Sequence, residues 1–255
     1  MLPFTKEEYQ ERVQKVKSTM AEKGMDVLFL VEPANMNWVS GYDAMSFYVP
    51  QGVVVSLDEE MPYWIGRFQD QYSAHVTTWL DDEHIRPYAD KYLWEPKVVH
   101  VMDFADFIKE KRWQAKTIGV EKDAHYFTAH WFERLTAALP DAKFTDATNM
   151  VNFLRAVKSK QELDYMGIAA RIVEKAMGNA IHMMEPGVRE NAVGAQILYD
   201  QAMGTGAFGG EYIALNPIIP SGDRTAAAHL TWKTEGCYEN NQLVYIEIAG
   251  CYRRY

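Results

Sequence analysis

The sequence of 255 residues predicts an α/β protein with two domains. In its first part, strand-like apolar runs alternate with helix-like patterns, which is typical of a mostly parallel or mixed sheet covered by helices. Near residue 157 this alternation of strand-like and helix-like patterns stops. Two long helical patterns then follow one another before strand-like runs return. We therefore expect an N-terminal α/β domain at residues 1–157 and a second domain at residues 158–255.

Caps and apolar runs predict the elements of the first domain. Thr5 followed by Glu8 is typical of a helix start, and Gly24 is the expected stop of that helix. The apolar run over residues 25–31 predicts a buried strand. Further expected elements are a strand pair (53–55 and 63–65), a short strand with an amphipathic helix (99–111), a strand (118–121) and two helices (125–139 and 150–155).

The second domain is expected to begin with a long helix. Ser159 precedes Glu162 by three residues, which is the pattern of a capping box. This helix should end at residues 185–187, where Pro and Gly occur together. A second helix is expected over 189–203, closed by Gly204, and strands are expected over 212–215 and 243–249.

Composition limits the classes of partner. A formal net charge of -9 argues against nucleic acid or an anionic membrane as a partner. Cys237 and Cys251 are too few for a disulfide framework and lack a zinc spacing, so reduced thiols are expected. No apolar run reaches the roughly 18 residues of a membrane span, and the N-terminus lacks the pattern of a signal peptide. We expect a soluble cytoplasmic protein that acts on a small-molecule substrate.

His229 and Glu247 are the candidate chemical groups of the second domain. His229 follows three alanines in a loop, and such small neighbours leave room for a ligand. It is predicted to be catalytic, the alternative being a loop histidine bonded to backbone. Period-two alternation puts Glu247 on a face opposite the apolar one, which predicts a cavity, because burying a lone carboxylate is costly. The alternative for Glu247 is a salt bridge to Arg253 or Arg254.

A second group of candidates lies in the first domain. The loop over residues 41–48 carries Met45, Phe47 and Tyr48, whose aromatic rings would suit a flat cationic substrate. These side chains are equally suited to capping the core of the domain. Arg67 is a candidate for binding a substrate carboxylate through two hydrogen bonds, and its alternative is a salt bridge with Asp70.

Three blocks in this order resemble the creatinase/prolidase/methionine-aminopeptidase family: residues 153–162, 184–190, and 221–229 with the strand-like run after them. The resemblance implies a creatinase-like N-terminal domain followed by a pita-bread α+β catalytic domain, incomplete here and inactive by itself. It also implies a homodimer in which the first domain of one subunit reaches the active site of the other. The segments 41–48 and 246–250 resemble the branch of the family that hydrolyses ectoine, a cyclic amidine.

The resemblance also bears on metal. Metallo-members of the family hold two ions, and the first ligand is an Asp at the position of Glu247. A glutamate places its oxygens differently, and the second ligand would fall after Tyr255. Because two-metal sites depend on closely placed bridging carboxylates, we expect no metal and no other cofactor, with His229 as the acid and base.

Three hypotheses for function follow. The first is a metal-free hydrolase that opens a C–N bond of a small cyclic amidine, with Glu247, Tyr48, Phe47, Met45 and Arg67 binding the substrate. The second is a two-metal Xaa-Pro dipeptidase or aminopeptidase. The third is a non-catalytic pita-bread domain that binds other proteins.

Overall fold

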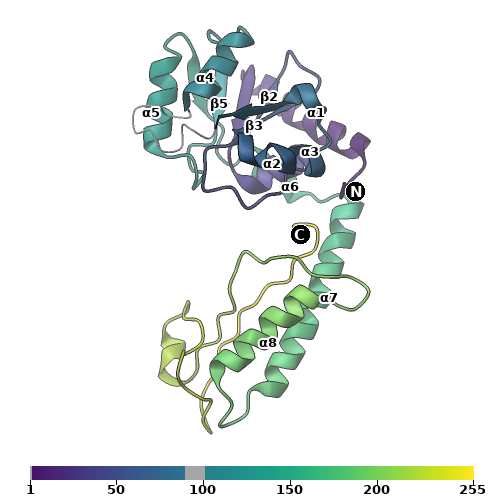
Figure 1. The fold of residues 1–255 in the computed structure, drawn as a ribbon, viewed down its shortest axis with the longest axis vertical. Coiled ribbons are helices and arrows are strands. Elements are labelled where there is room, and N and C mark those ends of the chain that lie inside the picture. Colours follow the sequence, from purple (N-terminus) through teal and green to yellow (C-terminus); the bar gives the residue numbers. More distant parts are fainter. Residues whose placement is uncertain (1, 90–100) are drawn as a thin grey trace. The chain divides into compact units, whose positions relative to one another are not determined.

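A computed structural model describes residues 2–89 and 101–255 of the chain. The chain divides into two compact units, Met1–Val157 and Lys158–Tyr255. Each unit has its own arrangement of elements and its own core, and each is described by itself (Figure 1). Among the residues that the structure describes, no helix has both the length and the apolar character needed to cross a membrane.

The first unit contains a mixed six-stranded sheet with the order β4-β3-β2-β1-β5-β6. β1 is parallel to β5 but antiparallel to β2, so the sheet changes from antiparallel to parallel pairing at β1. The expected hairpin is confirmed, because β2 and β3 pair antiparallel with Val53 opposite Trp64. The strands are β1 (Val27–Leu30), β2 (Gly52–Ser56), β3 (Tyr63–Arg67), β4 (Ile85–Tyr88), β5 (Thr117–Val120) and β6 (Lys143–Asp146).

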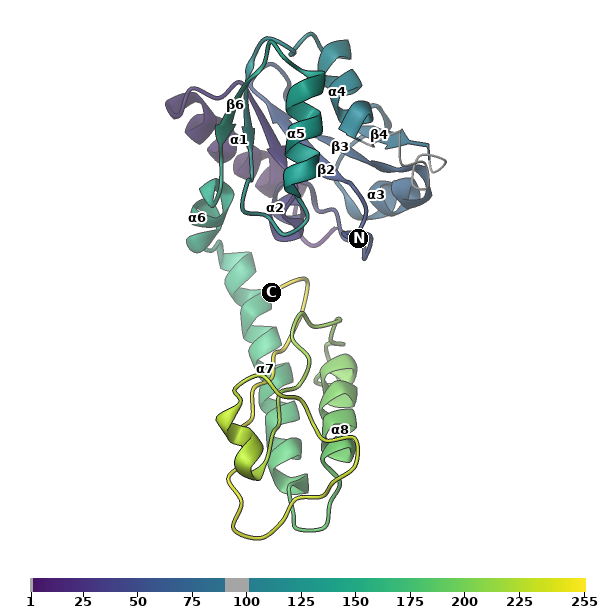
Figure 2. The ribbon, with the colours of Figure 1, turned by 90° about the vertical axis from the view of Figure 1, so that its left-hand side faces the viewer.

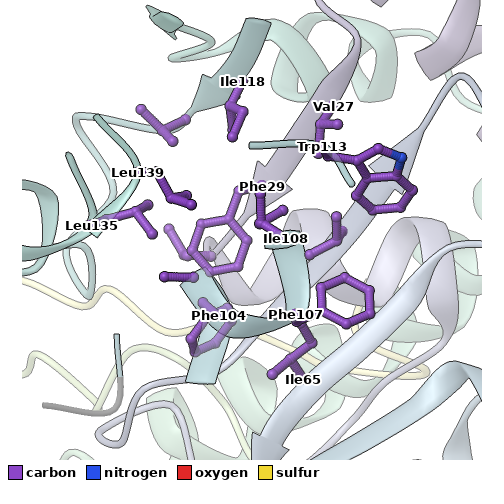
Figure 3. Close-up of a cluster of buried hydrophobic side chains, with 14 of the residues drawn as sticks. Val27, Phe29, Ile65, Phe104, Phe107, Ile108, Trp113, Ile118, Leu135 and Leu139 are labelled. Atoms are coloured by element: carbon purple, nitrogen blue, oxygen red, sulfur yellow. The ribbon is translucent and has the colours of Figure 1, made fainter. Parts of the chain in front are cut away.

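Aromatic rings join one face of this sheet to two of the helices. The ring of Phe29 in β1 lies 4.7 Å from that of Phe104 and 6.0 Å from that of Trp131, measured between centroids. Figure 3 shows this cluster, in which Phe104, Phe107 and Ile108 of α4 and Leu135 of α5 pack with side chains of the strands, and Trp113 and Leu139 follow the two helices. The helices of the unit are α1 (Lys6–Glu22), α2 (Pro33–Ser40), α3 (Gln71–Thr77), α4 (Val101–Glu110), α5 (Ala129–Ala138) and α6 (Met150–Ala156).

The second unit is organised by two helices, α7 (Lys160–Met183) and α8 (Glu190–Met203). The predicted capping box is confirmed: Ser159 Oγ accepts from the backbone of Glu162, whose carboxylate accepts from the backbone of Ser159. Figure 2 shows α7 and α8 side by side, with the extended segments of the unit packed against them. The helices and the extended segments enclose one cluster of buried residues. It consists of Ala180 from α7, Val193 and Ile197 from α8, and Ile219 and Tyr238 from the segments outside the helices.

Several expected elements differ from the structure. The helix expected over 125–139 begins only at Ala129, because Thr128 caps it by accepting from Trp131 N. Residues 212–215 form no strand. Among the described residues, the segment 243–249 makes only isolated bridges, in which Val244 pairs with Ser221 and Glu247 pairs with Ile218. The helix over 101–110 is confirmed, whereas the short strand expected just before it lies outside the described residues. The sequence reasoning missed α3, β4 and β6.

Candidate functional site

Glu247 lies on one of two extended segments that run antiparallel, and the other segment leads into the loop that carries His229. Ser221 pairs with Val244, and Ile218 pairs with Glu247. Ile218 and Glu247 exchange both backbone hydrogen bonds, at 3.0 and 2.9 Å. This pairing fixes the backbone of Glu247 and the start of the loop that leads to His229.

The alternation predicted for residues 243–249 is confirmed on its apolar side. Val244, Ile246 and Ile248 pack against the core shared by α7 and α8. Glu247 follows the opposite parity and is half-buried, and it accepts a 2.6 Å hydrogen bond from the hydroxyl of Tyr245. This hydrogen bond is the largest cause of the raised pKa of Tyr245, because only the protonated phenol can donate it.

The alternative interpretation of Glu247 as a salt-bridge partner is wrong. Arg254 ion-pairs with Glu211 at 3.6 Å, and its guanidinium lies 3.5 Å from the ring centre of Tyr212. Glu247 makes no ion pair with any residue in the described ranges 2–89 and 101–255. Its carboxylate is therefore engaged by one neutral donor from the protein.

His229 lies in the loop that follows the short 3-10 turn Gly222–Ala226. Its side chain is exposed, as are the three alanines before it. Within the described part of the chain the imidazole makes no hydrogen bond, so the alternative of a histidine bonded to backbone is not what the structure shows. Both ring nitrogens are therefore open to a ligand or to water.

Glu190, the first residue of α8, was missed as a site residue. Its side chain is fully buried and accepts hydrogen bonds from the Ser221 hydroxyl, the Arg224 guanidinium and the backbone N–H of Lys233. An acidic residue in the first turn of a helix is usually interpreted as a partner of the helix dipole. Its place as the last residue of the 184–190 block was the one signal in the sequence, and that block was used only for the family resemblance.

The loop between α2 and β2 places the aromatic candidates as expected. Met45 and Tyr48 are 58% and 66% exposed. Phe47 is half-buried, and its ring lies 5.0 Å from that of Tyr126, a residue that the sequence reasoning did not single out. A buried hydrogen bond of 3.0 Å between the hydroxyls of Tyr42 and Ser46 holds the first part of the loop in place.

Arg67 joins this loop to the end of β3. Its Nε donates to Asp70 at 2.5 Å, so the salt bridge considered as the alternative is present. Its Nη2 donates to the hydroxyl of Tyr48 at 3.2 Å, and the guanidinium lies 5.6 Å from the centre of that ring. The structure thus brings Arg67 and Tyr48 together, and Nη1 of Arg67 donates to no acceptor among residues 2–89 and 101–255.

A metal site can be tested against the donors that are present. In the described residues, no three side chains of His, Cys, Asp or Glu converge as they would around an ion. Glu247 has a tyrosine hydroxyl as its neighbour, and His229 lies free on its loop. The donor set that the structure describes does not fit a metal ion, and no step of the chemistry proposed for His229 is routed through one.

Two family models match the chain in succession. The creatinase/prolidase N-terminal domain matches residues 12–157, and metallopeptidase family M24 matches residues 164–255. The chain belongs to the creatinase/prolidase family. The resemblance expected from the three sequence blocks is thereby confirmed, as is the creatinase-like α/β domain followed by catalytic-domain sequence.

Individual relatives agree with this assignment. An ectoine hydrolase of Halomonas elongata is 39% identical over 100% of the chain and 65% of its own length. A Xaa-Pro dipeptidase of Pyrococcus furiosus is 24% identical over 96% of the chain and 62% of its own length. The solved structure of a Xaa-Pro dipeptidase from Bacillus anthracis has a TM-score of 0.74 and 19% identity, over 96% of this chain and 62% of that chain.

The chain therefore spans 65% of the length of the first relative and somewhat less of the other two. The relatives are hydrolases, and the family assignment makes this chain part of a hydrolase family. The solved structure supports the fold alone.

Proposed function

We propose that the protein hydrolyses a C–N bond of a small cyclic amidine, and that ectoine is this substrate. The observation that carries the proposal is the 39% identity to an ectoine hydrolase over the whole chain. Local features support it, since the chain presents an unengaged imidazole at His229 and a carboxylate at Glu247 with no cationic partner among the described residues. A cationic amidinium is a suitable partner for that carboxylate.

The proposed chemistry needs one proton carrier. His229 takes a proton from water as the water oxygen bonds to the amidine carbon. It then returns this proton to a ring nitrogen as the C–N bond breaks, and the hydroxyl proton of the intermediate passes to the released amine, which becomes an ammonium group. The net reaction adds one water and opens the ring to an N-acetylated diamino acid. Glu247 accepts an N–H of the amidinium and holds the cation during these steps.

The residues of the first unit are proposed to bind the substrate rather than to react. Tyr48 and Phe47 offer exposed or half-exposed rings, which suit a flat cation, and Met45 adds an apolar contact. Arg67 offers its Nη1 group to the substrate carboxylate while Asp70 fixes the rest of the guanidinium. These assignments rest on the resemblance to the family and on the contacts of the loop.

A second candidate function is a two-metal Xaa-Pro dipeptidase. The match to metallopeptidase family M24 and the 24% identity to a Xaa-Pro dipeptidase favour it. In that case metal ions would supply the hydroxide and polarise the carbonyl. Glu247, where metallo-members have Asp, stands against this candidate.

The test uses the chain fused, after Tyr255, to the part of the Halomonas elongata protein that follows its matched region; this chimaera is called the fused protein. Ectoine and a Xaa-Pro dipeptide are offered separately, and products are followed by proton NMR. Ring opening of ectoine, lost in the fused protein with His229→Ala, is the expected result. Cleavage of only the dipeptide would replace the first candidate by the second, and cleavage of neither would contradict both.

A further inference from the structure

Glu190 brings a carboxylate into a fully buried position at the start of α8. Burying a charge costs several kcal/mol unless it is paired and hydrogen-bonded. Here the compensation is extensive: the Ser221 hydroxyl donates at 2.5 Å, the Lys233 backbone N–H at 2.6 Å and Arg224 Nη1 at 3.2 Å. The Lys233 ammonium lies 3.5 Å away as a second cation.

These donors come from both ends of one loop. Ser221 begins it, Lys233 lies near its end, and Arg224 stands between them. His229 lies in the span that the three donors enclose. One carboxylate therefore closes the loop that carries His229, and we call this set of contacts the Glu190 clasp.

Other contacts reinforce the same closure. Arg224 also donates from Nη2 to the carbonyl of Thr231 at 3.0 Å, which joins the first part of the loop to the part that follows His229. Trp232 packs on Gly194 of α8 so closely that a Cβ at Gly194 would lie 2.6 Å from its ring. The loop is thus fixed on either side of His229, while the imidazole itself remains exposed.

We propose that Glu190 is a positioning residue for His229. This inference rests on the proposed function, because it assumes that His229 carries the proton. Glu190 is fully buried and so cannot touch a substrate; it acts by holding the loop in one conformation. Ordering the loop before substrate arrives removes an entropic cost from the reaction step.

The clasp itself can be tested without any activity, because Arg224 and Lys233 are both trypsin sites. The 255-residue chain with Glu190→Gln is digested under native conditions, and cleavage after each of these residues is followed by mass spectrometry. We expect cleavage to be about tenfold faster than in the parent chain, since weakening hydrogen bonds to a charge favours local opening. Glu235→Gln makes the same chemical change at an exposed position near the loop and should leave the rates unchanged.

Should Glu190→Gln lose its cooperative thermal transition, Ser221→Ala removes a single donor and serves in its place. The variant that folds, Glu190→Gln or Ser221→Ala, is compared with Glu235→Gln. Equal cleavage rates in the two would overturn the clasp. Faster cleavage supports it even if the fused protein fails to open ectoine, so failure of the proposed function remains distinguishable.

The link to His229 needs a second readout, which is a double-mutant cycle in the fused protein. If Glu190 acts through His229, Glu190→Gln lowers kcat by about tenfold in the parent but has almost no effect when His229→Ala is already present. Equal losses in both backgrounds would show that Glu190 only supports the fold, and would overturn the positioning role.

Discussion

The hydroxyl of Tyr245 donates a 2.6 Å hydrogen bond to Glu247 Oε2, so two residues of one face of the extended segment are joined. The phenol must lose this hydrogen bond to ionise, and its phenolate would face the carboxylate. Both effects raise the pKa of Tyr245 above its usual value. The pair therefore gives a spectroscopic reporter for the state of Glu247.

We predict that Glu247→Gln lowers the pKa of Tyr245 back toward its ordinary range. The charge next to the phenol disappears, while an amide oxygen remains as an acceptor. The pKa is measured by NMR on the chain labelled with ¹³C at the tyrosine ring, with the Tyr245 signal assigned through Tyr245→Phe. Glu235→Gln is the matched control. An unchanged titration in Glu247→Gln would show that the hydrogen bond is absent in solution.

A second prediction concerns Glu121, which joins segments far apart in the sequence of the first unit. Its carboxylate accepts from Val31 N at 2.7 Å, Glu32 N at 2.8 Å and Asn35 Nδ2 at 2.6 Å. Glu121→Gln turns one acceptor into a donor against these groups. We expect the free energy of unfolding of this unit to fall by about 1–3 kcal/mol. All tryptophans except Trp232 lie in residues 1–157, so their fluorescence in urea follows this unit.

The pH dependence of this effect has a definite sign. Burial is the largest cause of the raised pKa of Glu121. A carboxyl with a raised pKa in the folded state contributes stability that is present below its ordinary pKa and is lost as pH rises through the raised value. The parent chain should therefore gain stability relative to Glu121→Gln as pH falls from neutral. Asp123→Asn, at an exposed position nearby, is the control. A difference that shrinks at low pH would contradict the prediction.

Local signals in the sequence were sufficient where the structure depends on neighbours along the chain. Ser159 and Glu162 predict the start of α7 because a capping box involves only adjacent turns. The hairpin of β2 and β3 is predictable for the same reason. β4 was missed because Pro87 interrupts its pattern, and its position at the edge of the sheet explains how the proline is tolerated.

Long-range contacts account for what the sequence could not show. Residues 243–249 have the pattern of a buried strand, yet whether they form one depends on partners elsewhere, and they make only isolated bridges. Nothing near Glu190 in the sequence reveals that residues of a later loop bury it. Likewise, Tyr126 joins Phe47 only through the fold. The candidate site was therefore predicted as separate residues, without the contacts that hold them.

A third prediction addresses His229 directly. In the fused protein, His229→Ala should lower kcat by about 10²–10⁴, which is the usual contribution of a positioned acid and base. The side chain is exposed and makes no hydrogen bond with the described residues, so the thermal transition should hardly change. Kinetics with ectoine and a thermal melt measure the two effects. A kcat near that of the parent would return His229 to a structural role.

A fourth prediction concerns metal. Ring opening of ectoine by the fused protein should persist after exhaustive chelation, because the family resemblance places Glu247 where metallo-members have an aspartate. Residual metal is measured by mass spectrometry in the same sample. The control is the Xaa-Pro dipeptide assay under identical conditions. Activity lost on chelation and restored by manganese or cobalt would favour the two-metal dipeptidase.

The last prediction concerns assembly. The resemblance to the family implies a homodimer in which the loop of Met45, Phe47 and Tyr48 lines the site of the other subunit. Tyr48 is 66% exposed, so a substitution there should remove a surface group rather than open the core.

Fused protein with Tyr48→Ala and fused protein with His229→Ala are each expected to be impaired. Unfolding and refolding them together should restore activity, because some mixed dimers then contain one site with both residues intact. Parallel samples of each variant refolded alone give the baseline, and sedimentation measures the dimer. Dimers that mix without any gain over this baseline would place Tyr48 and His229 in the same subunit's site or Tyr48 in no site at all.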